Sequence, residues 1–316
     1  MNIVLLESLG ISNELLDKYA EKLRTEGHTF KIFEKTDNIE KLIEQTKDSD
    51  VIILANMPLK GEVIRACKKL KFIDVAFTGV DHIDLAAAKE MNIAVSNASG
   101  YSNDSVAELT ICMMLSLLRN VPTVDKCARE GKTKDGLVGN LLKGKTVGII
   151  GTGAIGMTTA NLCRAFGAKI IAYNGFSNKK DTDLITYLPL REMLEKSDIV
   201  TLHCPLTDKS KNLINKETLS YMKQTAILIN AARGGVVNSQ DLADALNQNR
   251  ISGAGIDVFE TEPPLDIEHP LLHSKNTIVT PHVAFATKES MELRAKIVFE
   301  NLSTWLAGKQ INKINY

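Results

Sequence analysis

The 316-residue chain lacks an excess of charge and lacks any long hydrophobic run. Lysine plus arginine and aspartate plus glutamate both number 38, so no net charge would draw the protein to a nucleic acid or to an anionic membrane. The longest uncharged apolar run, 109–118, is about half the roughly 20 residues that a membrane-spanning helix needs. We therefore expect neither a nucleic-acid partner nor a membrane partner.

Cysteine is also scarce and widely spaced. The five cysteines are Cys67, Cys112, Cys127, Cys163 and Cys204. An odd number of distant cysteines, most of them in apolar runs, is typical of reduced packing residues and not of a disulfide framework or a metal cluster. The first apolar run is too short for a secretory signal, and no basic segment precedes it. We expect a cytoplasmic protein without a bound metal.

What the sequence does contain is a regular alternation of strand-like and helical runs. Strands are predicted at 3–6, 30–33, 51–54, 72–76, 93–95, 146–150, 169–173, 199–202, 226–230, 253–257 and 277–280. Helices are predicted at 12–24, 38–46, 61–69, 85–89, 102–120, 154–166, 190–195, 216–222, 239–247 and 288–306. This alternation indicates parallel sheets with helices on both faces, and the length is too great for one ordinary core. The predicted fold class is therefore α/β, with two doubly wound parallel-sheet domains.

A glycine-rich turn at 151–156 separates the predicted strand 146–150 from the helix that begins at 154. Gly151 allows a tight turn, Gly153 lets a pyrophosphate approach the backbone, and Gly156 lets the helix pack closely on its strand. A helix N-terminus also presents unpaired N–H groups to phosphates. An isolated match to this pattern is weak evidence. Because strand, turn and helix follow in order, the segment predicts a dinucleotide-binding turn.

Six of the predicted strands, from 146–150 onwards, make the number found in a full dinucleotide-binding sheet. The last predicted helix, 288–306, lies beyond the final strand of that sheet. We expect it to cross back and pack on the first domain. The predicted domains are therefore 1–99, completed by 284–316, and 100–283.

Three reactive side chains follow predicted strands in the second half of the chain, where ligands of open α/β sheets bind. Arg233 carries a fork of donors suited to a carboxylate or a polarised carbonyl, although an arginine at a strand end is often only a surface residue. His282 follows the next strand but one and could be purely structural. Glu262 could fix its tautomer and stabilise its protonated form, and Glu260 is an equal candidate on composition.

Several motifs resemble the D-isomer-specific 2-hydroxyacid dehydrogenases along essentially the whole chain. The matching segments lie at 79–85 (GVDHIDL), 105–109 (SVAEL), 151–156, 203–207 (HCPLT), 230–234 (NAARG), 255–264 (GIDVFETEPP) and 280–284 (TPHVA). The resemblance implies a Rossmann-type dinucleotide domain plus a flavodoxin-like substrate domain. It also implies that Arg233 clamps the substrate, that His282 is the acid/base, and that Glu262 is the partner of His282.

The resemblance further assigns binding residues. It implies that the backbone around Thr78, Gly79 and Val80 holds the substrate carboxylate, with Tyr101 in the cleft-lining segment 99–101. The cofactor-binding residues that it implies, besides the three glycines, are Ala154 and Ile155 at the pyrophosphate, Cys204, Pro205 and Thr207 at the adenosine half, and Ala231, Ala232 and Asp257 at the nicotinamide. On the residues alone, Cys204 and Pro205 would be ordinary packing and turn residues.

One position departs from the family pattern. The acid that usually binds the ribose at the end of the second strand is replaced by Asn174, and Lys179 and Lys180 follow closely. The cofactor is therefore NAD or NADP, with the choice open. A neutral Asn174 would not repel a 2′-phosphate, and the two lysines could attract one or could simply be solvated.

The resemblance implies reduction of a small 2-oxo acid to the D-2-hydroxy acid, in a homodimer. The segment 96–108 is most similar to hydroxypyruvate reductases, also called glycerate dehydrogenases, and hydroxypyruvate or glyoxylate is the favoured substrate. The alternatives are a phosphoglycerate or D-lactate dehydrogenase. Other classes on the same scaffold are a dinucleotide-sensing corepressor, which can keep all three reactive residues, and a formate dehydrogenase, whose histidine pairs with a glutamine.

Overall fold

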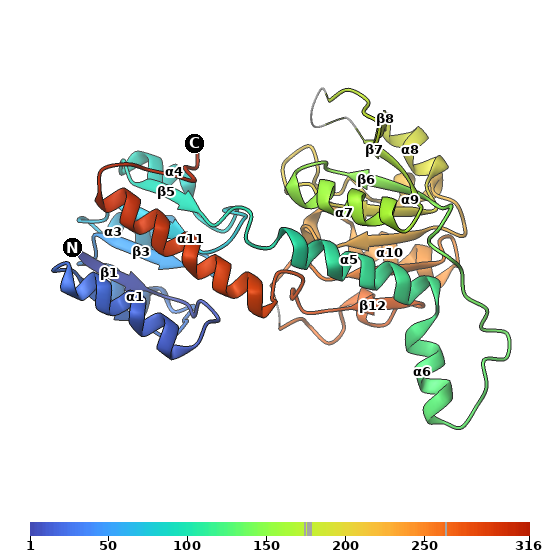
Figure 1. Ribbon diagram of the computed structural model, residues 1–316, viewed down its shortest axis with the longest axis horizontal. Coiled ribbons are helices and arrows are strands. Elements are labelled where there is room, and N and C mark those ends of the chain that lie inside the picture. Colours follow the sequence, from blue (N-terminus) through green and yellow to red (C-terminus); the bar gives the residue numbers. More distant parts are fainter. Residues whose placement is uncertain (174, 176–178, 263) are drawn as a thin grey trace. The chain divides into compact units, whose positions relative to one another are not determined.

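The computed structural model describes residues 1–173, 175, 179–262 and 264–316 (Figure 1). The chain forms two compact units. The first contains Met1–Ser102 and Ala286–Tyr316, so both termini belong to it, and the second contains Asn103–Phe285.

The first unit is built on a five-stranded parallel sheet with the order β2-β1-β3-β4-β5. Its strands are β1 (Asn2–Leu5), β2 (Thr29–Ile32), β3 (Val51–Leu54), β4 (Phe72–Val75) and β5 (Ala94–Asn97). Its helices are α1 (Asn13–Thr25), α2 (Ile39–Thr46), α3 (Gly61–Ala66), α4 (Leu85–Glu90) and α11 (Lys288–Leu306). This 2-1-3-4-5 order is that of flavodoxin-like folds, which confirms the predicted fold class of this unit.

Local sequence explains where these helices begin. The side chains of Ser12, Asn38 and Asp84 each accept a hydrogen bond from a first-turn amide of α1, α2 and α4. Thr287 and Ser290 form a capping box at the start of α11. Each cap satisfies amides that would otherwise lack a partner at a helix start.

The chain after α11 returns along the edge strand β5. Ser96 and Lys313 form an antiparallel bridge, and Ile314 N–H donates to the Val95 carbonyl at 2.9 Å. The Ser96 hydroxyl donates to the Ile311 carbonyl at 2.7 Å. The C-terminal segment therefore covers backbone groups that β5 would otherwise expose.

The second unit is built on a seven-stranded parallel sheet with the order β12-β11-β10-β9-β6-β7-β8. Its strands are β6 (Thr146–Ile150), β7 (Lys169–Tyr173), β8 (Thr186–Leu188), β9 (Ile199–Leu202), β10 (Ile227–Asn230), β11 (Gly253–Ile256) and β12 (Thr277–Val279). Its helices are α5 (Asn103–Leu118), α6 (Val121–Arg129), α7 (Ala154–Ala165), α8 (Leu190–Lys196), α9 (Lys216–Tyr221) and α10 (Ser239–Asn247), with short 3-10 turns at Gly234–Val236 and Pro270–Leu272.

Taken from β8 across the sheet, this is the 3-2-1-4-5-6 order of the Rossmann fold with β12 as a seventh strand. The sheet separates two hydrophobic clusters because successive strand residues point to opposite faces. Ile149 belongs to the cluster under α5 and α7, whereas Ile150 belongs to the cluster under α8, α9 and α10. The order reverses between β6 and β9, so the glycine turn after β6 lies at the switch point where such folds bind ligands.

Two predicted features of this unit were wrong. The six predicted strands omit β8, a three-residue, partly exposed strand that pairs only with β7. The predictions also omit α6, which has no buried residue. No helix within the described ranges is long and apolar enough to cross a membrane.

Candidate active site

The three glycines of the turn after β6 lie in three different surroundings. Gly151 has a φ of +99°, and a Cβ there would lie 2.6 Å from the backbone of His203 and Cys204. A Cβ at Gly156 would collide with the Gly151 carbonyl oxygen. A Cβ at Gly153 would have no described atom within 4 Å, so this position is open to an approaching molecule.

The start of α7 suits an anion. Gly153 is its N-cap and supplies no capping side chain, and the first turn contains no acidic residue. Ala154 is exposed and Ile155 is half-buried. The first-turn amides of this twelve-residue helix therefore face the open side of Gly153 with the positive end of the helix dipole, and the residues present fit a dinucleotide pyrophosphate.

The segment after β9 runs beside this turn, because His203 N–H donates to the Ile150 carbonyl at 2.7 Å. The Cys204 side chain is buried, and burial raises the pKa of its thiol to about 11, so it packs as a neutral group. Pro205 and Thr207 are exposed, and Thr207 N–H donates to the Ser210 hydroxyl at 2.7 Å. Of the three residues predicted here, only Pro205 and Thr207 therefore have side chains accessible to a cofactor.

His203 was given no role by sequence, yet it lies between the glycine turn and β9. Burial lowers the pKa of His203 to about 4, so its ring is neutral at ordinary pH. Its Nε2 is 3.0 Å from the Thr201 hydroxyl. Among the described residues, its Nδ1 has no hydrogen-bond partner.

Asn174, the position predicted to discriminate between the cofactors, lies outside the described residues, as do Ser177 and Asn178. Lys179 is described, and its ammonium donates to the Thr152 carbonyl in the glycine turn. The Tyr187 hydroxyl donates to the Thr152 side chain at 3.0 Å. One lysine of the predicted basic pair thus lies at the turn itself.

Arg233 follows β10 on a segment fixed by Asn230. The Asn230 side chain accepts from Ala232 N–H at 3.1 Å and donates to the Arg233 carbonyl at 2.9 Å. Arg233 is half-buried, and one of its Nη1 hydrogens is directed to the Ala232 carbonyl at 2.8 Å. A side chain on the next residue, Gly234, would collide with the backbone of Phe259, so the segments after β10 and β11 touch.

Asp257, at the end of β11, holds the segment that carries His282. Its carboxylate accepts from the Thr280 hydroxyl at 2.5 Å and from the N–H groups of Val283 and Ala284 at 2.9 Å each. Burial raises the pKa of Asp257, and these hydrogen bonds oppose that rise. Because the carboxylate is fully buried in these bonds, its predicted contact with nicotinamide stays a prediction.

His282 adopts a left-handed backbone conformation that is unusual outside glycine and asparagine, with a φ of +55°. Its N–H donates to the Asp257 carbonyl at 2.7 Å. The ring Nδ1 lies 2.8 Å and 3.0 Å from the two carboxylate oxygens of Glu262, and the Phe285 ring packs edge-on at 5.4 Å. The carboxylate fixes Nδ1 as the protonated nitrogen, which leaves Nε2 to exchange a proton with a substrate.

Glu260 occupies a separate pair. Its carboxylate lies 3.2 Å from His269 Nε2. Burial alone would raise the pKa of Glu260, but hydrogen bonds from Ser239 and His269 bring it below its usual value. The structure therefore pairs Glu262, and not Glu260, with His282.

The predicted substrate-binding residues of the first unit follow β4 and β5. Thr78, Gly79 and Val80 are half-buried in the loop after β4. Tyr101 is buried instead of open, with its ring 6.3 Å from Phe77 and beneath the Arg294 guanidinium at 5.8 Å. Its predicted direct contact with a substrate stays a prediction.

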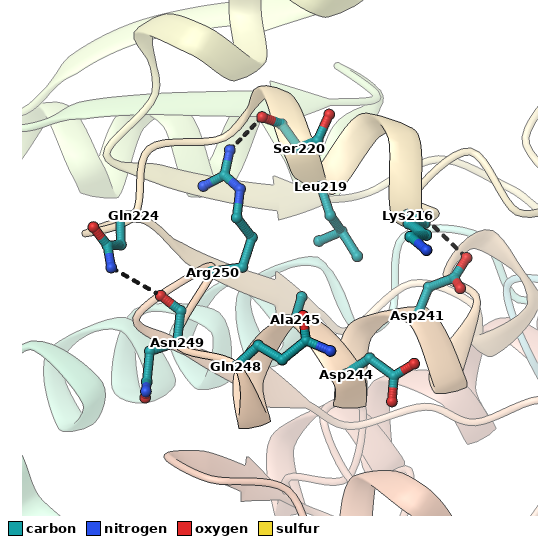
Figure 2. Close-up of a pocket in the computed structure, with 10 residues that line it drawn as sticks. All are labelled: Lys216, Leu219, Ser220, Gln224, Asp241, Asp244, Ala245, Gln248, Asn249 and Arg250. Atoms are coloured by element: carbon teal, nitrogen blue, oxygen red, sulfur yellow. Dashed lines mark hydrogen bonds between the residues drawn. The ribbon is translucent and has the colours of Figure 1, made fainter.

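A cavity of about 620 Å³ lies elsewhere, between α9 and α10 (Figure 2). Leu219 and Ala245 line its apolar part, and Arg250, whose guanidinium donates to the Ser220 carbonyl, and Asp244 line its polar part. None of the predicted site residues that the structure describes lines this cavity.

Comparisons with known proteins agree with one another. The family model described as D-isomer specific 2-hydroxyacid dehydrogenase, NAD binding domain, matches residues 111–284. The chain is 35% identical over 288 residues to a hydroxypyruvate reductase of Blautia hydrogenotrophica, covering 88% of both chains. It is 39% identical over 282 residues to a glyoxylate reductase of Thermofilum pendens, covering 85% of this chain and 82% of the relative. The solved structure of an acyclic imino acid reductase in complex with NADPH and D-Arg has a TM-score of 0.91, with 29% identity and complete coverage of both chains.

Proposed function

Since the chain belongs to the D-isomer-specific 2-hydroxyacid dehydrogenases, an NAD- or NADP-dependent family that acts on 2-oxo and 2-hydroxy acids, we propose that its substrate is hydroxypyruvate or glyoxylate. The relatives named for these two activities match over most of their own length, which favours this pair. Phosphoglycerate and D-lactate dehydrogenase activities are the alternatives within the family.

The observation that carries the mechanism is the His282–Glu262 pair at 2.8 Å. When bound, the reduced nicotinamide supplies a hydride to the carbonyl carbon of the 2-oxo acid. His282 Nε2 gives a proton to the carbonyl oxygen as the alkoxide develops, and Glu262 stabilises the imidazolium before that transfer. Arg233 binds the substrate carboxylate and carbonyl through its planar fork. The product is the D-2-hydroxy acid.

In the first unit, the backbone amides of Gly79 and Val80 are the proposed ligands of the substrate carboxylate. Neither amide has a hydrogen-bond acceptor within the described part of the chain. Half-buried N–H groups are normally paired, so two consecutive ones without a protein acceptor suit an anion.

Cofactor choice rests on residues 174–180. A neutral Asn174 would leave an adenosine 2′-phosphate unrepelled, and the Lys179 ammonium lies at the glycine turn. We propose that NADPH is accepted at least comparably with NADH. Comparing kcat/KM for the two reduced cofactors tests this, and a strong preference for NADH would contradict it.

A homodimer is the proposed assembly. Helix α6 has no buried residue. In α6 and the loop after it, Val121, Val138 and Leu141 are 46%, 75% and 69% exposed. Exposed apolar side chains on one segment suit a second copy of the chain. Light scattering should give twice the 34.7 kDa chain mass, and Leu141→Asp should shift the mass towards that of one chain. A single-chain mass for the unmodified protein would contradict the proposal.

Initial rates on a panel of 2-oxo acids test the substrate. We expect kcat/KM for hydroxypyruvate or glyoxylate to exceed that for pyruvate and 3-phosphohydroxypyruvate by at least about tenfold, which corresponds to roughly 1.4 kcal/mol. The panel also includes formate, tested for oxidation, and 2-oxo acids supplied with an amine, because proteins of similar structure are named as formate dehydrogenase and imino acid reductase. Tight binding of the reduced cofactor without turnover of any of them would favour a dinucleotide-sensing protein.

A further inference from the structure

The cavity between α9 and α10 is built from one face of each helix (Figure 2). The lining residues of α10 and its C-cap recur at intervals that place them on one side of a helix, and they are Asp241, Asp244, Ala245 and Gln248. The lining residues of α9 have the same spacing, and they are Lys216, Leu219 and Ser220. The space of about 620 Å³ is large enough for a small organic ligand.

Hydrogen bonds between the two helical segments hold both ends of this space. At the helix starts, Lys216 N–H donates to the Asp241 carboxylate at 2.9 Å. At the helix ends, the Arg250 guanidinium donates to the Ser220 carbonyl (Figure 2). Because these bonds already join α9 to α10 and to the segment after it, a ligand meets walls that are in place and loses less free energy to ordering them.

Charges of opposite sign stand at the two ends of the cavity. Arg250 is half-buried, and its guanidinium has N–H donors beyond the one that Ser220 accepts. At the other end, two carboxylates, those of Asp241 and Asp244, outnumber the single ammonium of Lys216 (Figure 2). Within the described residues, neither Arg250 nor either aspartate forms an ion pair. One end of the cavity therefore attracts an anion and the other a cation.

Between the two charged ends the floor of the cavity is apolar. Leu219 and Ala245 are only 1% and 8% exposed, and Figure 2 shows them between the Arg250 guanidinium and the Asp244 carboxylate. A ligand that reaches both ends must therefore separate its own charges by an apolar stretch. An α-amino acid carries its ammonium and its carboxylate on one carbon, so it can satisfy only one end at a time.

We propose that this cavity binds an aliphatic ω-amino acid. Its carboxylate accepts from Arg250, its ammonium donates to Asp241 and Asp244, and its methylene chain lies on Leu219 and Ala245. This site is independent of the proposed function, because none of these five residues belongs to the candidate active site.

The test measures binding of 6-aminohexanoate to the full-length protein by ligand-observed NMR titration. A Kd of about 1–10 mM is expected for a ligand of this size. Three analogues isolate the requirements: hexanoate lacks the ammonium, hexylamine lacks the carboxylate, and 2-aminohexanoate is an isomer with both groups on one carbon. Each should bind at least about fivefold more weakly, because each leaves one charged end of the cavity unpaired.

Substitutions locate the site. Arg250→Gln and Asp244→Asn should each weaken 6-aminohexanoate binding by about five- to tenfold. Arg191→Gln and Glu217→Gln are the matched controls, since they remove charges of the same two signs from α8 and α9 outside the cavity, and Kd should stay within about twofold. Arg233→Lys should also leave Kd unchanged, because Arg233 serves the proposed active site. Thermal melts show whether each variant is folded, and Asp244→Asn, whose side chain is exposed, carries the test if Arg250→Gln does not fold.

Several results would overturn this binding site. They are the absence of saturable binding of 6-aminohexanoate, equal binding of any of the three analogues, and undiminished binding in the folded cavity variants. A loss of binding in Arg233→Lys but not in Arg250→Gln or Asp244→Asn would place 6-aminohexanoate in the active site and would overturn the proposal as well. Each of these results leaves the proposed reduction of a 2-oxo acid intact.

Discussion

Replacing Glu262 with glutamine removes one negative charge beside His282 while nearly preserving the shape of the side chain. In the unmodified protein both carboxylate oxygens lie within 3.0 Å of His282 Nδ1. A glutamine amide can still accept from Nδ1, but it can also donate to it and so favour the wrong tautomer. The variant therefore has a less stable imidazolium and a less defined ring.

The size of the effect follows from distance and exposure. Two unit charges about 3 Å apart interact by roughly 5 kcal/mol at an effective dielectric of 20. Because the Glu262 side chain is 54% exposed and that of His282 only 10%, solvent screening reduces this to about 1.5–3 kcal/mol, the range for hydrogen bonds to charged groups. The expected loss in kcat/KM for 2-oxo acid reduction is about 10- to 100-fold.

Loss of absorbance of the reduced nicotinamide gives the rates, and titration of the cofactor gives its Kd. Glu260→Gln is the matched control. It removes a charge of the same sign only two residues away in the sequence, but the Glu260 carboxylate pairs with His269 and not with His282. We expect the control to stay within about twofold of the unmodified rate. Equal losses in the two variants, or full activity in Glu262→Gln, would refute the assignment of Glu262 as the partner of His282.

Four further outcomes are expected. His282→Gln should lower turnover by at least the roughly 100-fold typical of losing a general acid, with cofactor Kd little changed; a rate on hydroxypyruvate within fivefold of the unmodified enzyme would contradict this. Arg233→Lys should lower kcat/KM by at least about tenfold, because a point charge cannot bind two oxygens as a fork does, and an unchanged ratio would make Arg233 structural. Asn174→Asp should shift preference towards NADH by about 10- to 100-fold and less at high salt, and a shift that does not depend on salt would contradict the electrostatic explanation. Burial raises the pKa of Asp74 well above its usual value, although a hydrogen bond from Asn301 opposes the rise, so the fold loses stability as pH rises above the pKa that Asp74 has in the unfolded chain. In Asp74→Asn the melting temperature should therefore fall less between about pH 4 and 7 than in the unmodified protein. Parallel pH profiles of the two melting temperatures would contradict this.

Much of the fold was predictable because buried strands carry their own signal. The apolar runs that became β3, β6 and β9 were predicted with the observed bounds, since nearly every residue in them is buried. Strand β8 gives no such signal, because three partly exposed residues form it only by pairing with β7. Helix α6 buries nothing, although Pro122 in its first turn is a helix-start signal that could have located it.

The site was predictable where it depends on strand ends and not where it depends on tertiary hydrogen bonds. Composition could not separate Glu260 from Glu262. The family resemblance favoured Glu262, and the folded geometry pairs each carboxylate with its own histidine. The bonds from Val283 and Ala284 to Asp257 depend on how the segment after β12 turns back. Likewise, the bond from Asn97 to Thr78 joins the last residue of β5 to the loop after β4 and leaves no local pattern in the sequence.

The central claim is that the protein transfers a hydride to C2 of a 2-oxo acid and that His282 supplies the proton. The most direct measurement follows reduction of hydroxypyruvate by a reduced cofactor in which deuterium replaces both hydrogens on the transferring carbon, with the glycerate product analysed for label and configuration. We expect D-glycerate with one deuterium at C2, and at least about 100-fold less of it per unit time from His282→Gln. Unlabelled product, L-glycerate, or equal rates in the two proteins would contradict the account.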